Sequence, residues 1–292
     1  MANKQYISPI RLFKQLDISL DGDINVSRIK KQLAAEFDFN ASGIFEVDGF
    51  AYNKSDLFEE IENPDFFERL SYHKRIWESK HLLETLERNE LNLPEVFAAL
   101  KNFSNDEVFD NFISSYFAVS FNNVVRGYLN PAKLQVLGDW YRCESYVLTQ
   151  DKEEAYKATR IFLDENIRLL KNVNTQNFKT FRPQIAHWFT KGGANFFNNL
   201  PDTFHDEKNQ IVFHMINICV AIQRNFKYDC KTLSRELTCM QNLPEDYQKI
   251  IDSNHRIYMG ESASSSSDGE KSYGWIIWVV IVIIRIIIMM AK

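Results

Sequence analysis

Apolar residues recur at helical intervals along most of the chain. Between residues 26 and 39, Ile29, Leu33 and Phe37 follow one another in steps of four, so they share one face of a helix. Few breakers interrupt the pattern, because the chain has only 10 Gly and 7 Pro in 292 residues. The same spacing predicts one long helix over residues 64–88 and further helices at about residues 151–173, 183–190, 207–226, 230–241 and 244–258.

Turn and capping residues place several helix ends. Ser55 is suited to cap a helix that ends before Pro64. Pro94 fits the first turn of the next helix, where its missing N–H costs nothing. Residues 104–107, Ser-Asn-Asp-Glu, match a capping box that opens an aromatic-rich helix, and Asn130-Pro131 ends that helix.

One strand signal interrupts the helical pattern. Two short apolar runs near residues 44–52 flank the pair Asp48-Gly49. This pair suits a type I′ turn, because both central residues of that turn need a positive φ. We therefore predict a small β-hairpin within an otherwise mainly α, irregular multi-helix domain.

The composition divides the chain into three parts. Residues 1–259 are rich in aromatic side chains and typical of a folded domain, with the hairpin in an N-terminal part of about residues 1–63. Residues 260–272, "GESASSSSDGEKS", are small and polar, and they predict a Ser-rich flexible linker. Residues 273–292 are almost entirely apolar. Spacing gives no evidence of a tetratricopeptide or other repeat.

The apolar segment predicts a single transmembrane helix. Its residues 274–291 would span about 27 Å as a helix, against a bilayer core of about 30 Å. Trp275 and Trp278 suit the headgroup level at one end, and Lys292 closes the other. The segment has no evident polar face, which argues against a buried core helix.

Arg285 lies within this segment. An Arg near a helix centre costs about 2.5–3.5 kcal/mol on the insertion scale, whereas eight Ile and three Val together contribute roughly −3 to −7 kcal/mol. The arginine also lies about 4 Å from the midpoint, so its guanidinium can reach the distal headgroups. The alternative is that Arg285 pairs with a carboxylate on a partner helix.

Charge and cysteine content restrict the compartment and the partners. The net charge is −5, and without Arg285 and Lys292 it is about −7, which disfavours a nucleic-acid partner and a body lying on anionic lipid. The four cysteines form no CxxC pair, which favours a reducing compartment. With no signal-peptide pattern at residue 1, we expect a cytoplasmic body and a tail-anchored arrangement. Basic residues tend to stay on the cytoplasmic side of a membrane, and slightly more of them lie towards the C-terminal end of the apolar segment than before it. This weakly favours the opposite orientation, with the C-terminus in the cytoplasm.

No motif of a known reaction, cofactor or metal is evident. The chain lacks GxSxG, HExxH, P-loop and GxGxxG patterns. Residues 21–25 begin like a calcium loop, but Val26 stands where Gly is needed and Gln32 where a bidentate Glu is needed. We therefore expect that this acidic turn leads into the following helix, and we predict no catalytic, cofactor-binding or metal residues.

Two Arg–His pairs carry a family resemblance. Arg75 with His81, in "RIWESKH", and Arg182 with His187, in "RPQIAH", are spaced in a way that resembles the nuclease motif of helical HEPN domains. The resemblance implies that Arg and His converge on a scissile phosphate. The alternative is chance spacing, with His187 an ordinary helix residue and His73 and His81 on a solvated flank. The Pro after Arg182 also predicts a non-helical backbone there.

These observations favour a binding or scaffolding module held at a membrane, with the bilayer and a protein as partners. One alternative is a membrane-tethered HEPN-like nuclease. Another is membrane perturbation through self-association of residues 273–292, which the absence of a small-xxx-small pattern after Gly274 weakens.

Overall fold

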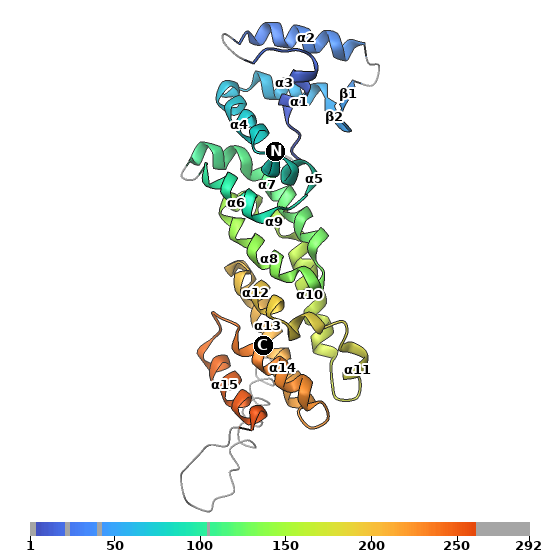
Figure 1. The fold of residues 1–292 in the computed structure, drawn as a ribbon, viewed down its shortest axis with the longest axis vertical. Helices are drawn as coiled ribbons and strands as arrows, with labels where there is room; N and C mark the ends of the chain where they lie inside the picture. Colours follow the sequence, from blue (N-terminus) through green and yellow to red (C-terminus); the bar gives the residue numbers. More distant parts are fainter. Residues whose placement is uncertain (1–3, 21–23, 40–42, 104–105, 261–292) are drawn as a thin grey trace, which may run out of the picture.

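The computed structural model describes residues 4–20, 24–39, 43–103 and 106–260. Within these residues the protein is mainly helical and contains one small two-stranded antiparallel sheet, as predicted. The molecule is elongated, and its elements follow the long axis in approximate sequence order (Figure 1).

The N-terminal half contains seven helices and the sheet among its described residues. Their bounds are α1 Pro9–Gln15, α2 Val26–Asp38, β1 Ile44–Val47, β2 Phe50–Asn53, α3 Lys54–Glu62, α4 Phe66–Glu78, α5 Lys80–Arg88, α6 Leu93–Lys101 and α7 Glu107–Tyr128.

The C-terminal half alternates α-helices with short 3₁₀ segments. Its α-helices are α8 Leu134–Trp140, α9 Lys152–Ala155, α10 Lys157–Asn172, α11 Phe178–Phe181, α12 Lys191–Asn199, α13 His205–Ile222, α14 Lys227–Thr238 and α15 Glu245–Met259. The 3₁₀ segments are η1 Pro131–Lys133, η2 Tyr141–Tyr146, η3 Thr149–Asp151, η4 Ala186–Phe189 and η5 Asp202–Phe204.

The predicted hairpin is confirmed. Strands β1 and β2 are antiparallel, and Val47 pairs with Phe50 next to the turn. Asp48 and Gly49 have φ values of 51° and 80°, the left-handed conformation that a two-residue type I′ turn requires. Because this signal depends only on neighbouring residues, the sequence alone was sufficient to find it.

The predicted long helix over residues 64–88 is wrong. Ser79, with φ −93° and ψ 87°, separates α4 from α5. Its N–H donates to the carbonyls of Arg75 and Ile76 at 3.2 and 3.1 Å, which closes α4. The bend lets Ile76 and Leu82 both enter the same core, where each is fully buried. Tertiary packing therefore overrides a continuous helical pattern that contains no Gly or Pro after Pro64.

Two predicted caps are also replaced by neighbouring residues. Asn53, not Ser55, caps α3: its Oδ1 accepts the Ser55 N–H at 2.9 Å. Asp106 caps α7 by accepting the Phe109 N–H at 3.0 Å, whereas Ser104 lies outside the described residues. Both substitutes are Asn or Asp, which serve as well as Ser at this position. Pro94 lies in the first turn of α6, as predicted.

Other helix boundaries in the structure also differ from the predicted ones. The predicted helix over residues 151–173 is interrupted at Tyr156, and that over residues 183–190 is the 3₁₀ segment η4 preceded by α11. Helices α1, α8, α11 and α12 were not predicted. The last three predicted helices correspond to α13, α14 and α15, with ends shifted by one to four residues.

Buried apolar side chains form two clusters. The smaller cluster gathers α1, α2, the hairpin, α3 and the start of α4, with Phe66 and Leu70 among its members. The larger cluster contains the buried apolar residues of α4 from Tyr72 onwards and those of the later elements as far as α15. Tyr6, from the N-terminal segment, also belongs to the larger cluster. Helix α4 and the residues before α1 therefore cross the junction between the two clusters.

Candidate functional site

The four residues predicted to anchor the chain in a membrane, Trp275, Trp278, Arg285 and Lys292, lie outside the described residues, as does most of the predicted linker. Among the helices that the structure describes, none combines the length and the apolar composition that a bilayer crossing requires. The transmembrane helix therefore stays a prediction from sequence.

The first Arg–His pair does not form a joint site. Arg75, on α4, donates through Nη2 to the carbonyl of Asn102 at 2.6 Å, and its guanidinium lies 4.0 Å from the ring centroid of Phe103. His81, on α5, has its Nδ1 3.2 Å from a carboxylate oxygen of Glu84. The two side chains are engaged by different neighbours on different elements.

The second pair is also separated by its contacts. The Arg182 Nε donates to Asp229 Oδ1 at 3.0 Å, which ties it to α14. The expectation of a non-helical backbone before Pro183 is wrong, since Arg182 has φ −49° and ψ −43°. Its N–H donates to the Phe178 carbonyl at 2.8 Å and closes the single turn of α11, a bond that offsets the steric preference of a residue before proline.

His187 is a buried structural residue. Asn166 Oδ1 accepts from the His187 Nε2 at 2.7 Å and from the Trp188 Nε1 at 3.0 Å, so the histidine proton lies on Nε2. Burial lowers the pKa of His187 to about 4, which keeps the ring neutral near pH 7. A ring that is neutral and 4% exposed cannot approach a phosphate.

We expect no RNA cleavage that depends on either Arg–His pair, because neither converges on a common point. Purified wild type should leave single-stranded RNA intact without added metal, and His81→Ala and His187→Ala should not differ from it. Circular dichroism of each variant is the folding control. Metal-independent cleavage that a folded His81→Ala or His187→Ala variant loses would contradict this expectation and favour the nuclease alternative.

A polar chain that the sequence did not reveal crosses the cluster junction. It consists of Tyr6, His73, Glu60 and Arg69. The prediction that His73 lies on a solvated flank is wrong, since it is 3% exposed. Its Nδ1 lies 2.8 Å from the Tyr6 hydroxyl and its Nε2 3.2 Å from Glu60 Oε1. Arg69 holds both Glu60 oxygens through Nε and Nη2, at 2.7 and 2.6 Å.

The protonation states in this polar chain follow from its contacts. Burial opposes ionisation of Glu60, but the hydrogen bonds from His73 and Arg69 outweigh it and hold the pKa of Glu60 at about 2. Burial lowers the pKa of His73, although its bond to Glu60 acts in the opposite direction. An ionised Glu60 only accepts, so Nε2 carries the proton and Nδ1 accepts from Tyr6. Tyr6 is 1% exposed, out of reach of a substrate.

An ion pair forms a second polar connection at the same junction. Arg11, on α1, donates from Nη1 and Nη2 to the two oxygens of Glu87, on α5, at 2.8 and 2.6 Å. The Ser8 N–H donates to Glu87 Oε1 at 2.8 Å, and the Tyr52 hydroxyl donates to the Ser8 carbonyl at 2.9 Å. The Arg11 guanidinium stacks 4.0 Å from the Phe50 ring centroid. These contacts fix the hairpin and α1 against α5.

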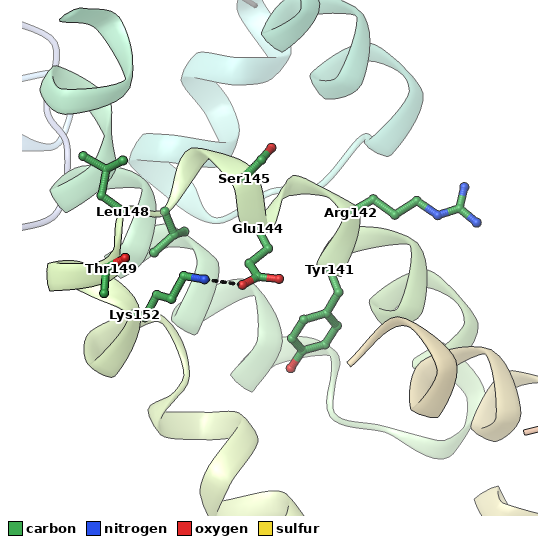
Figure 2. Close-up of a pocket in the computed structure, with 8 residues that line it drawn as sticks. Tyr141, Arg142, Glu144, Ser145, Leu148, Thr149 and Lys152 are labelled. Carbon is green, nitrogen blue, oxygen red and sulfur yellow. Dashed lines mark hydrogen bonds and ion pairs between the residues drawn. The ribbon is translucent and has the colours of Figure 1, made fainter. Parts of the chain in front are cut away.

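A surface hollow of about 520 Å³ lies beside η2, η3 and α9 (Figure 2). Its polar lining includes Arg142, Glu144, Ser145, Thr149 and Lys152. Lys152 Nζ lies 2.6 Å from Glu144 Oε1, so these two charges neutralise each other. Arg142 points away from this ion pair in Figure 2. The charged groups therefore do not converge on one point, as a catalytic centre would require.

The described residues contain no group of three or more His, Cys, Asp or Glu side chains placed to hold a metal ion. Residues 21–23 of the calcium-like stretch lie outside them. Cys143, Cys219, Cys230 and Cys239 are all free, and the first three are buried.

Comparison with models of protein families, with curated protein sequences and with solved structures gives no match.

Proposed function

We propose that this protein is a membrane-tethered binding or scaffolding module, with a helical body in the cytoplasm and residues 273–292 as a single transmembrane helix. The observation that carries this proposal is the position of Gly260. It ends α15 in a left-handed conformation, with φ 80°, at one end of an elongated molecule (Figure 1). The Ser-rich and apolar segments follow it directly in the sequence.

Several features of the body support a binding role at a cytoplasmic membrane surface. Elements α2, β1 and α4 lie at the end opposite α15 (Figure 1). Phe39, which follows α2, and Phe67, on α4, are 89% and 56% exposed, as apolar side chains that meet a protein partner would be. The free cysteines fit a cytoplasmic environment. A tether that confines such a body near a bilayer raises its effective concentration for membrane-bound partners.

Deleting residues 273–292 should move the protein from the membrane fraction to the soluble fraction with its helical content intact. The full chain should resist extraction by alkaline carbonate. Ile283→Asp with Ile284→Asp keeps the length of the segment but adds at least about 5 kcal/mol to its insertion free energy, so it should behave like the deletion. Fractionation and circular dichroism measure both properties.

Arg285→Leu is the matched control, because it keeps the segment apolar and should remain in the membrane fraction. If the arginine only reaches the headgroups, cross-linked species in the membrane should be the same in this variant and in wild type. Loss of one such species would show that Arg285 pairs with a partner helix. A truncated body that unfolds or stays in the pellet would refute the tether itself.

A further inference from the structure

Basic residues gather at the end of the body where α15 ends. Residues 171–182, 223–232 and 253–260 contain seven Lys or Arg and one acidic residue, a net charge of +6, while the whole chain carries −5. The remainder of the chain therefore carries −11. We name this surface the basic end; its cationic residues are Lys171, Lys179, Arg182, Arg224, Lys227, Lys231 and Arg256.

Contacts between the three segments bring them together. Thr175 Oγ1 donates to the Ala221 carbonyl at 2.8 Å, which joins the loop after α10 to the end of α13. The rings of Phe178 and Phe226 lie 4.8 Å apart, which joins α11 to the start of α14. Helices α14 and α15 pack against each other, and both the start of α14 and the end of α15 lie at this end of the molecule (Figure 1).

Most of this positive charge is free to meet a ligand. Asp229, the one acidic residue of the basic end, is paired with Arg182 at 3.0 Å. The other six cations are exposed and have no carboxylate within ion-pair distance among the described residues. Tyr228, Ile257 and Met259 lie among them with exposures of 79%, 59% and 42%. Cations interleaved with exposed apolar groups are typical of a surface that meets lipid headgroups.

We propose that the basic end docks on the anionic headgroups of the membrane that holds residues 273–292. This inference rests on the proposed function, because the tether supplies the proximity. A flexible linker of thirteen residues would have a root-mean-square span of about 20 Å, and the linker predicted from the sequence over residues 260–272 has this length. The basic end is the part of the body that such a chain holds at the bilayer.

The chemistry of the two surfaces is complementary. Lys and Arg donate to headgroup phosphates and carboxylates, and each contributes roughly fivefold to partitioning onto an anionic leaflet. Tyr228 and Ile257 can enter the interface beside them. The overall charge of −5 does not oppose this docking, because screening limits charge effects to about 8 Å at physiological salt, and 28 of the 39 acidic residues precede Lys171 in the sequence. Docking would orient the long axis of the body away from the membrane plane, with the N-terminal end away from the bilayer.

The test uses the full chain, reconstituted into phosphatidylcholine vesicles with or without phosphatidylserine. In a Cys239→Ser background, an environment-sensitive fluorophore is placed at Asn225→Cys in the basic end, or at Phe39→Cys at the opposite end. Nitroxide-labelled headgroups should quench the probe at residue 225 only in vesicles that contain phosphatidylserine, and should leave the probe at residue 39 unquenched. High salt should abolish the quenching.

Charge reversal provides the matched comparison. Arg224→Glu with Lys227→Glu should lower the ratio of docked to undocked body at least about 25-fold. Arg28→Glu with Lys31→Glu makes the same charge change on α2 and should leave the quenching at residue 225 unaltered. Equal effects of the two double variants, or quenching in phosphatidylcholine alone, would overturn docking by the basic end.

Vesicle flotation separates this inference from the proposed function. Protein that fails to float with the vesicles would refute the tether. Protein that floats but shows no quenching at residue 225 would refute docking alone. Binding of single-stranded RNA to the floated protein without lipid quenching would identify a nucleic acid as the ligand of the basic end and also overturn the proposal.

Discussion

Replacing Glu87 with alanine should lower the free energy of unfolding by about 3–5 kcal/mol. The side chains of Arg11 and Glu87 are only 10% and 2% exposed, so the variant would remove the buried, bidentate partner of the guanidinium. It would leave Arg11 only Asp48, whose carboxylate lies 3.7 Å from Nε and is 73% exposed. The Ser8 N–H would lose its acceptor as well. Because these contacts join α1 to α5, the loss should be global. Chemical denaturation, followed by circular dichroism, measures it.

Two further variants show whether burial is the cause. Glu62→Ala breaks the pair with Lys30, where the Glu62 side chain is 56% exposed, and should cost no more than about 1 kcal/mol. Replacing both Arg11 and Glu87 with Met removes both charges and should cost less than Glu87→Ala alone. If Glu62→Ala and Glu87→Ala proved equally mild, the Arg11 ion pair would not be a structural connection between the two clusters.

Features determined by neighbouring residues were predictable from the sequence. The turn at Asp48-Gly49 and the helix Val26–Asp38 each depend on a few consecutive side chains, and both are present as predicted. The turn needs only two adjacent residues that accept a positive φ, and the helix needs only apolar residues that recur every four positions and so form one face.

Features determined by tertiary contacts were not predictable. Nothing near Ser79 in the sequence marks a break, which results from the burial of both Ile76 and Leu82. His73 looked solvated because polar residues surround it in the sequence, yet its partner Tyr6 is 67 positions away. Arg11 and Glu87 are 76 positions apart. A single sequence carries no signal that pairs such residues.

The spatial distribution of charge also depends on tertiary contacts and was not predictable from the sequence. A net charge of −5 disfavours contact with anionic lipid when the chain is treated as a whole. The fold instead brings together basic residues from three segments, none of which forms a conspicuous run. Net charge describes solubility and long-range repulsion, whereas binding depends on where the fold places each charge.

Gly193→Ala should destabilise the protein by at least about 2 kcal/mol, although alanine is the better helix former by about 1 kcal/mol. Gly193 lies in the first turn of α12, and its N–H donates to the capping Thr190 Oγ1 at 3.2 Å. A Cβ at this position would overlap the carbonyl oxygen of His187, which also accepts from the Thr190 hydroxyl at 2.7 Å. The methyl group would therefore force apart the turn that holds Trp188 in the larger cluster.

Gly127→Ala is the matched control for this overlap. It also lies in a helix, α7, but a Cβ there meets no atom within 4 Å. We expect it to leave stability unchanged or raise it by up to about 1 kcal/mol, since only the helix propensity changes. Thermal and urea unfolding of both variants against wild type measure the difference. Gly193→Ala as stable as Gly127→Ala would mean that the backbone between η4 and α12 does not approach Gly193 closely, and the position would then impose no requirement for glycine.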